Sequence, residues 1–225
     1  MRRPWIKMCG ITDPGSGREA ALAGADLIGV NFVPESPRAV SFGIAIRISL
    51  AFKGAPTGRG KKRARRTVAV FANPDDDLVR SVIEHVKPDI LQFHGDESPT
   101  FCRSFGVPFL KAFRLAEMED ADAIERYLGG LAAGYLVDAW SPVAFGGTGR
   151  LIRIEVAQHA LRHAKGFLAG GLKPDNVGDL VRRLRPFGVD VASGIETRPG
   201  VKSPDLMAAF VRAVESACRE DAAGP

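Results

Sequence analysis

Trp5-Ile6-Lys7-Met8-Cys9-Gly10-Ile11-Thr12 is a short apolar run that stops at a cysteine and a glycine, and it is the first of a series of such runs that decides the fold. Successive side chains of a strand alternate between its two faces, so Lys7 and Cys9 point the same way and Cys9 lies where the strand ends. Taken alone, a cysteine at such a place is ordinarily a small hydrophobic residue of the core.

Apolar, β-branched runs recur along the chain and alternate with stretches of helical period. We expect strands at Trp5–Cys9, Leu27–Phe32, Thr67–Phe71, Ile90–Phe93, Phe109–Phe113, Gly134–Val137, Gly166–Ala169 and Val189–Val191. We expect helices between and after them at about Ser16–Ala23, Ile44–Phe52, Asp76–His85, Ser98–Phe105, Met118–Leu128, Leu151–Arg162, Pro174–Leu184 and Ser203–Cys218.

Eight strand-and-helix units in about 220 residues predict a single-domain α/β protein, a TIM barrel in which eight parallel strands alternate with helices. We expect the barrel to span residues 1–219 and the tail 220–225 to be frayed. The rival is a doubly wound open sheet, which commonly has fewer strands and a glycine fingerprint after the first. Cys9-Gly10-Ile11-Thr12 is not that fingerprint.

Composition restricts the class of protein. The chain has 225 residues, 45% of them hydrophobic, which suffices for a substantial core. Three scattered cysteines without a CxxC pair argue against a disulfide framework or a zinc site and favour a cytoplasmic location. No segment approaches the roughly 18 consecutive apolar residues of a membrane span, so we expect no membrane association.

A possible metal site is Glu155, His159 and His163, which repeat along one helix face. On an outer helix of a barrel these side chains face solvent, so we expect no metal ion.

The net charge of +5 comes from one segment. Six cations lie between Arg59 and Arg66, and outside this segment basic and acidic residues nearly balance. The segment 54–66 contains turn-forming glycine and proline, follows a helix and precedes a strand. We therefore expect an exposed, mobile loop on the bottom face of the barrel, away from any active site, and no nucleic-acid partner.

Polar side chains follow several strands, and in this fold catalytic residues lie at the carboxyl ends of strands. Arg38, after the second strand, offers a planar fork suited to a carboxylate or phosphate. Gln92 and His94 share a face where the fourth strand ends, and His94 is either a general acid or base or a hydrogen-bonded residue of the mouth. Asp138 directly ends the apolar sixth strand. Burying a carboxylate there costs free energy unless it has polar partners or a catalytic or binding role.

Glycines mark the ends of the seventh and eighth strands, in Leu168-Ala169-Gly170-Gly171-Leu172 and Val191-Ala192-Ser193-Gly194. They let backbone N–H groups approach an anion, and these two loops of a TIM barrel frequently bind phosphate beside a helix N-terminus. We therefore expect a phosphate site built from Gly170, Gly171, Ser193 and Gly194.

Seven motifs, in order along the chain, resemble one family, phosphoribosylanthranilate isomerase of tryptophan biosynthesis. They are Lys7-Met8-Cys9-Gly10-Ile11-Thr12, Ser36-Pro37-Arg38, Gln92-Phe93-His94-Gly95-Asp96-Glu97, Leu136-Val137-Asp138, Gly146-Gly147-Thr148-Gly149, Leu168-Ala169-Gly170-Gly171-Leu172-Lys173-Pro174 and Gly188-Val189-Asp190-Val191-Ala192-Ser193-Gly194-Ile195-Glu196. The family converts N-(5-phosphoribosyl)anthranilate to 1-(2-carboxyphenylamino)-1-deoxyribulose 5-phosphate by an Amadori rearrangement without a cofactor. The chain departs from the family pattern directly after Gly149.

The resemblance implies that Cys9 is the general base and Asp138 the general acid, on strands at different sides of the mouth. Each such proton transfer typically contributes about 10²–10⁴-fold to the rate. A cysteine is a poor base until it is a thiolate. We expect Lys7, one layer deeper on the same face and roughly 7 Å away, to favour the thiolate by about 2 kcal/mol at an effective dielectric of 20.

The resemblance also implies the substrate contacts. Arg38 faces the anthranilate carboxylate, Gln92 and His94 contact the substrate, and Asp190 is a ligand-facing polar residue at the mouth. The expected partner is this sugar phosphate, and the chain is a monomer or a homodimer. Two alternatives stay open: a related aminoaldose-phosphate isomerase, which uses aspartate where this chain has Cys9, and a catalytically silent barrel that serves as a binding or scaffold module.

Overall fold

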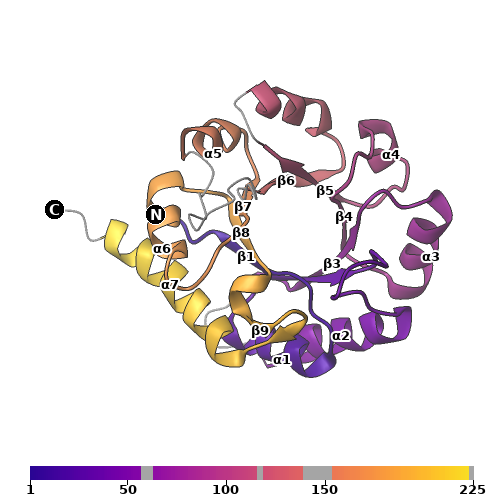
Figure 1. Cartoon of the computed structure of the whole chain (residues 1–225), viewed down its shortest axis with the longest axis horizontal. Coiled ribbons are helices and arrows are strands. Elements are labelled where there is room, and N and C mark those ends of the chain that lie inside the picture. The colour runs from indigo at the N-terminus through magenta and orange to yellow at the C-terminus, as the bar shows by residue number, and fades with distance from the viewer. Residues whose placement is uncertain (57–62, 116–118, 139–153, 223–225) are drawn as a thin grey trace, which may run out of the picture.

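The computed structural model describes residues 1–56, 63–115, 119–138 and 154–222. Eight parallel strands close into a barrel in chain order, and the TIM barrel prediction is confirmed. They are β1 (Trp5–Met8), β2 (Leu27–Asn31), β3 (Arg66–Phe71), β4 (Ile90–Phe93), β5 (Phe109–Arg114), β6 (Ala132–Asp138), β7 (Gly166–Ala169) and β8 (Gly188–Val191). Figure 1 looks along the barrel and shows the helices arranged around its outside.

The helices follow the expected order with shifted ends, but the helix expected at Met118–Leu128 is a 3₁₀ helix, and the last helix continues to Ala222, into the tail that was expected to be frayed. They are α1 (Pro14–Ala23), α2 (Phe42–Gly54), α3 (Asp76–Val86), α4 (Pro99–Arg103), α5 (Ile154–Ala160), α6 (Val177–Leu184) and α7 (Pro204–Ala222), with 3₁₀ helices η1 (Glu119–Tyr127) and η2 (Ser193–Ile195). Side-chain N-caps fix the starts of four of them, through Asp13, Ser41, Asp75 and Ser98. Within the described part of the chain, no helix is long and apolar enough to cross a membrane.

The start of α6 differs from the prediction for a local reason. The proline pattern suggested that α6 begins at Pro174, but it begins at Val177. The Asn176 side chain accepts a hydrogen bond from the Lys173 backbone N–H at 2.8 Å and donates to the Gly171 carbonyl at 2.9 Å. These bonds hold the segment as a turn beside the seventh strand end, because an asparagine side chain competes with helical hydrogen bonding.

Alternation along the strands divides the core into two layers. Outward side chains such as Ile6 and Met8 pack against the surrounding helices, whereas inward ones such as Leu27 and Val68 fill the barrel. Lys7 also points inward and is 0% exposed. Strand register places Asp190 of β8 directly beside it.

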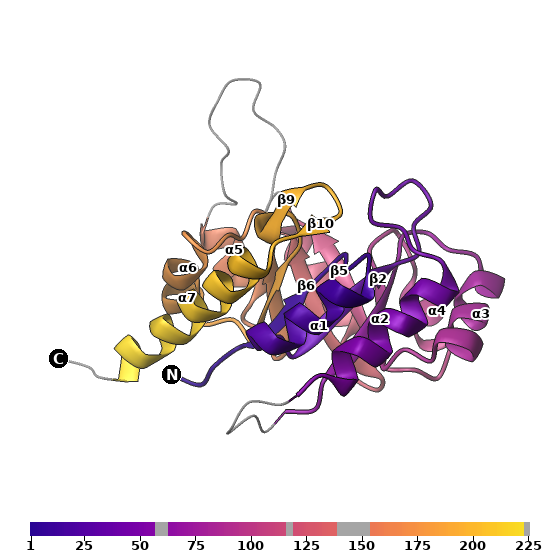
Figure 2. The ribbon, with the colours of Figure 1, turned by 90° about the horizontal axis from the view of Figure 1, so that it is seen from below.

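A two-stranded hairpin, β9 (Glu196–Arg198) and β10 (Val201–Lys202), follows η2 and was not expected from the sequence. Figure 2 shows it at the end of the barrel where the strands have their carboxyl ends. The Thr12 hydroxyl donates to the Gly200 carbonyl in the hairpin turn at 2.7 Å. The hairpin is therefore joined to the loop after β1.

The described part of the basic segment differs from the expectation of an exposed loop. Arg65 is buried and donates to the carbonyls of Phe52 and Pro56 at 2.9 and 2.7 Å. Arg63 donates to the carbonyls that precede β1 and lies over the Trp5 ring, 4.7 Å from its centroid. Burial lowers the pKa of both guanidinium groups. These two cations join the end of α2 and the start of β1, while residues 57–62 lie outside the described residues.

Candidate active site

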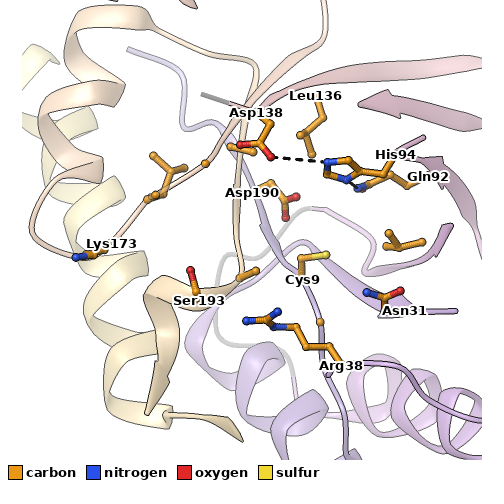
Figure 3. Close-up of a pocket in the computed structure, with 17 residues that line it drawn as sticks. Cys9, Asn31, Arg38, Gln92, His94, Leu136, Asp138, Lys173, Asp190 and Ser193 are labelled. Atoms are coloured by element: carbon orange, nitrogen blue, oxygen red, sulfur yellow. Dashed lines mark hydrogen bonds and ion pairs between the residues drawn. The ribbon is translucent and has the colours of Figure 1, made fainter. Parts of the chain in front are cut away.

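A cavity of about 480 Å³ opens at the carboxyl ends of the strands. Most of the expected site residues line it, namely Cys9, Arg38, Gln92, His94, Asp138, Gly170, Gly171, Asp190 and Ser193. Figure 3 shows the side chains converging on this space from strands all around the barrel. Lys7 lies below them in the barrel interior, and the expected glycine loop 146–149 lies outside the described residues.

Cys9 is the cysteine of the three that faces the cavity, whereas Cys102 and Cys218 are buried. Burial, reinforced by the nearby charge of Glu97, raises the pKa of Cys102 to about 12, so that thiol stays protonated at neutral pH. The space beside Cys9 exists because residue 29 is glycine. A Cβ on Gly29 would lie 2.7 Å from the Cys9 sulfur and 3.3 Å from the Lys7 ammonium.

Lys7 and Asp190 form a buried ion pair directly below the cavity. The ammonium lies 3.0 Å from both carboxylate oxygens of Asp190. Burial disfavours the charged ammonium, but its interactions with Asp190 and Cys9 outweigh this cost and raise the pKa of Lys7. Asp190 lines the cavity as expected, yet its carboxylate is already bound to Lys7, a contact that the sequence did not reveal.

A row of polar groups crosses the cavity from β4 to β6. The Asp138 carboxylate lies 3.7 Å from His94 Nε2, and each side chain is about one-quarter exposed. The Gln92 amide nitrogen lies 3.5 Å from His94 Nδ1. Gln92 is 1% exposed, and its Oε1 has no hydrogen-bond partner among the described residues. A buried acceptor without a partner is rare in proteins and suggests that a ligand completes it.

Backbone hydrogen bonds hold the loop that carries His94. Glu97 is buried, accepts from the Gly95 backbone N–H at 3.0 Å and lies 3.3 Å from the Lys111 ammonium. The following helix α4 is capped by Ser98. This buried ion pair fixes the loop while leaving the histidine ring at the cavity.

The loops after β7 and β8 touch each other through their backbones. Gly170 and Gly171 have φ angles of +83° and +61°, which side chains other than glycine rarely adopt. A Cβ on Gly194 would overlap the Leu172 carbonyl oxygen. Ser193 is exposed at the cavity edge. Glycine is therefore required at Gly170 and Gly171 for their backbone conformation and at Gly194 for the close contact between the two loops.

Arg38 already binds a carboxylate, that of Glu196. Its Nε donates to Glu196 Oε1 at 2.8 Å and its Nη2 to Oε2 at 2.6 Å, and these hydrogen bonds raise the pKa of Arg38. Gly10, with φ of +70°, leaves the space for the arginine, since a Cβ there would lie 3.3 Å from Arg38 Cγ and closer still to Cδ.

Sequence reasoning assigned no role to four residues that shape the cavity or its border. Asn31 lines it and holds the second loop, with its amide donating to Ser36 Oγ at 3.0 Å. Lys173 adds a cation beside the glycine loops. Glu196 and Lys202 stand behind Arg38. Glu196 closes the last family motif, which was the one available signal for it.

Among the described residues, no group of three histidine, cysteine or carboxylate side chains is placed to hold a metal ion. Of the histidine stripe, Glu155 is exposed while His159 and His163 are half-buried. Both histidines lie next to Arg162, and His163 Nε2 lies 3.9 Å from Glu125. The chemistry that the cavity offers is therefore that of a thiol, a carboxylate and an imidazole with cations beside them.

Comparison of sequences points to one family. Residues 6–213 match the family model of N-(5'phosphoribosyl)anthranilate (PRA) isomerase. The N-(5'-phosphoribosyl)anthranilate isomerase of Trichlorobacter lovleyi is 37% identical over 213 residues, which cover 94% of this chain and 98% of that protein. The enzyme of Stenotrophomonas maltophilia is 40% identical over 218 residues, which cover 96% of this chain and 94% of that protein.

Comparison with solved structures indicates the same family. The crystal structure of phosphoribosyl anthranilate isomerase from Thermotoga maritima is similar with a TM-score of 0.79 and 29% identity, covering 95% of this chain and 99% of that one. A phosphoribosyl anthranilate isomerase in complex with reduced 1-(o-carboxyphenylamino)-1-deoxyribulose 5-phosphate matches with a TM-score of 0.73 and 26% identity, covering 95% and 99%. On these matches, which span nearly its whole length, the chain belongs to the N-(5'-phosphoribosyl)anthranilate isomerase family.

Proposed function

We propose that the chain isomerises N-(5-phosphoribosyl)anthranilate to 1-(2-carboxyphenylamino)-1-deoxyribulose 5-phosphate in tryptophan biosynthesis, with Asp138 as general acid and Cys9 as general base. Family membership supports the reaction. The observation that carries the assignment of roles is that the Asp138 carboxylate and the Cys9 thiol reach one cavity from β6 and from the end of β1 (Figure 3). A sugar lying between them meets an acid on one side and a base on the other.

In the first step Asp138 gives its proton to the furanose ring oxygen. The C1–O bond breaks, and the nitrogen lone pair forms the C=N bond of a protonated Schiff base. His94 lies close enough to Asp138 to share a proton with it through a small shift of either side chain. The acid and the imidazole together can therefore deliver the proton and take it back as the cycle closes.

In the second step the Cys9 thiolate removes the C2 proton. The C–H electrons form the C1=C2 bond of an enolamine while the C=N electrons return to nitrogen, and tautomerisation gives the ketone. We propose that Lys7 favours the thiolate and that Asp190 keeps Lys7 charged and in place. The Lys7 ammonium and the Cys9 sulfur lie closer together than strand spacing alone suggests, since both approach the Cβ position of residue 29. Because Asp190 offsets the Lys7 charge, the effect on the thiolate is smaller than that of a lone cation at the same place.

The remaining residues bind the substrate in this proposal. The Arg38 bonds to Glu196 use Nε and one N–H of Nη2, so its outer edge remains for the anthranilate carboxylate. The unpaired oxygen of Gln92 accepts a ribose hydroxyl. The phosphate lies against the backbone of Gly170, Gly171, Ser193 and Gly194, with Lys173 adding a positive charge at the same edge.

For the assembly, the phosphoribosylanthranilate isomerase of Thermotoga maritima is described as dimeric. We propose that the present chain is a monomer or a homodimer, which sedimentation velocity of the purified protein decides. We also propose a cytoplasmic location, and activity recovered only in the membrane fraction of lysed cells would contradict it.

The activity is tested by mixing the purified protein with freshly made phosphoribosylanthranilate and following the loss of its fluorescence, with the product identified by mass. We expect turnover of this substrate and none of the two-phosphate aminoaldose used by the related isomerase, because a second phosphate site is not part of the proposed cavity. Turnover of the latter alone would favour the related isomerase. A protein that binds but does not turn over either compound would favour the scaffold alternative.

A further inference from the structure

A buried charge cluster stands behind Arg38, at the border of the cavity. Glu196 binds Arg38 on one side and the Lys202 ammonium on the other, at 2.7 Å from Oε1. The side chains of Glu196 and Lys202 are 4% and 0% exposed, whereas that of Arg38 is 22% exposed. Arg38 is therefore the member of the cluster that reaches the cavity.

The charges of the cluster do not balance. Burial disfavours the Glu196 carboxylate, but the hydrogen bonds from Arg38 and Lys202 outweigh it and lower the pKa of Glu196, so that it is ionised at neutral pH. Two cations and one carboxylate leave one positive charge within the cluster itself, although burial lowers the pKa of Lys202 and the Cys9 sulfur, when ionised, acts on both cations. Since only Arg38 reaches the cavity, that excess charge is offered to a ligand through the arginine, and one further carboxylate would neutralise it.

The cluster also connects two loops that bind opposite ends of the proposed substrate. The Lys202 ammonium donates to the Ala192 carbonyl at 2.9 Å, and Ala192 directly precedes Ser193 of the proposed phosphate site. On the other side, Glu196 holds Arg38 by two hydrogen bonds in a fork-to-fork geometry. Figure 3 shows the Arg38 guanidinium directed into the cavity from the loop after β2.

Glu196 could in principle compete with a ligand for Arg38 rather than hold the arginine in place. Its burial argues against competition. A carboxylate that left Arg38 would remain in the protein interior with Lys202 alone, and breaking a buried charge network is strongly unfavourable. The bonds also leave the outer edge of the guanidinium available, so that both carboxylates can be bound at once.

We infer that Glu196 and Lys202 are positioning residues that fix Arg38 at a set distance from the loop after β8, and that this cluster gives the site its selectivity for an aromatic amine bearing a carboxylate. The inference rests on the proposed function, since it assumes that the carboxylate and the phosphate of one molecule are bound together. The cluster itself touches no reacting atom.

The test uses the variants Glu196→Gln, Glu196→Asp and Lys202→Met, with Glu35→Gln as the matched control. Glu35 is an exposed carboxylate in the same loop as Arg38. The kcat and KM for phosphoribosylanthranilate are measured for each. Competition assays give Kd for two ligands, the reduced carboxyphenylamino-deoxyribulose phosphate and its phenylamino counterpart without the carboxylate.

Loss of charge-assisted hydrogen bonds predicts a KM raised about 10- to 100-fold in E196Q, with kcat changed far less. The Kd of the carboxylated ligand rises equally, that of the phenylamino ligand stays at the parent value, and E196D recovers part of the loss. K202M also raises KM and the Kd of the carboxylated ligand, and E35Q changes neither constant.

The inference is overturned if E196Q has an unchanged or lower KM, or if it loses affinity equally for both ligands, which would indicate a merely structural role. An inactive parent refutes the proposed function instead, and this is seen before any variant is compared. In that case the two ligands still test the cluster, because the parent's preference for the carboxylated one must fall in E196Q.

Discussion

Replacing Lys7 by methionine removes one partner of a buried ion pair and leaves the Asp190 carboxylate in the barrel. The side chains of Lys7 and Asp190 are 0% and 9% exposed. Breaking such a pair from one side typically costs about 3–5 kcal/mol, because the remaining charge loses its partner and is only slightly exposed to water. We expect Lys7→Met to lower the free energy of unfolding by about this amount, measured by urea denaturation at pH 7.

The double variant Lys7→Met/Asp190→Asn separates stability from chemistry. It removes both charges, so most of the lost free energy of unfolding returns. The Cys9 thiolate then lacks both the Lys7 cation and the opposing charge of Asp190, so alkylation of Cys9 by iodoacetamide at pH 7 falls severalfold, less than the roughly thirtyfold equivalent of about 2 kcal/mol for a lone cation. Mass spectrometry of the Cys9 peptide gives this rate, and the buried Cys102 and Cys218 serve as slow internal references.

Two results would refute this reasoning. If Lys7→Met were as stable as the parent, the ion pair would be irrelevant to the fold. If the folded double variant were alkylated at the parent rate across pH 6–9, Lys7 would have no electrostatic effect on Cys9, and its role would be limited to filling the barrel. The pH dependence of the pair has a definite sign, since a raised lysine pKa gives stability that is lost only as the pH rises above about 10.4.

Three further outcomes follow from individual contacts. In Gly29→Ala the new Cβ meets the Cys9 sulfur, so kcat is expected to fall at least about tenfold in a protein that still melts cooperatively. Gln92→Leu removes a buried unpaired oxygen, so the free energy of unfolding is expected to stay level or rise by about 1 kcal/mol while KM rises. Because the pKa of Glu196 is lowered, its contribution to stability is present above about pH 4.3 and lost below it, and Glu196→Gln is expected to flatten the acid limb of the stability profile, as followed by urea melts from pH 3 to 6.

The barrel could be predicted because its strands are self-contained apolar runs. Ile90–Phe93 and Gly166–Ala169 occur in the structure with the predicted bounds. The hairpin β9–β10 could not, because Glu196–Lys202 is short and polar and has neither the alternation nor the apolar content of a strand. It forms because tertiary contacts to Thr12 and Arg38 hold it in place.

The gathering of the site at one mouth was predictable from the fold, since parallel strands place their carboxyl ends together. The partners of the charged groups were not. Lys7 and Asp190 are 183 positions apart, and Arg38 and Glu196 are 158 apart. Sequence spacing carries no signal for such contacts, which depend on strand register and on the path of the hairpin.

The contacts of the basic segment 54–66 could not be predicted from the sequence either. Its composition indicated solvent exposure, but the carbonyl groups at the end of α2 need donors, and Arg65 supplies them from inside the protein. A guanidinium is suited to several carbonyls at once, so a cation-rich run can be partly structural.

The central claim is that one carboxylic acid and one thiolate, facing each other across this cavity, carry out the isomerisation. The most direct test is the kcat of the parent, Cys9→Ala and Asp138→Asn on freshly made phosphoribosylanthranilate, with exposed Asp96→Asn as the control. We predict losses of about 10²–10⁴-fold in both cavity variants and parent activity in the control. Parent-level turnover in both Cys9→Ala and Asp138→Asn would contradict the account.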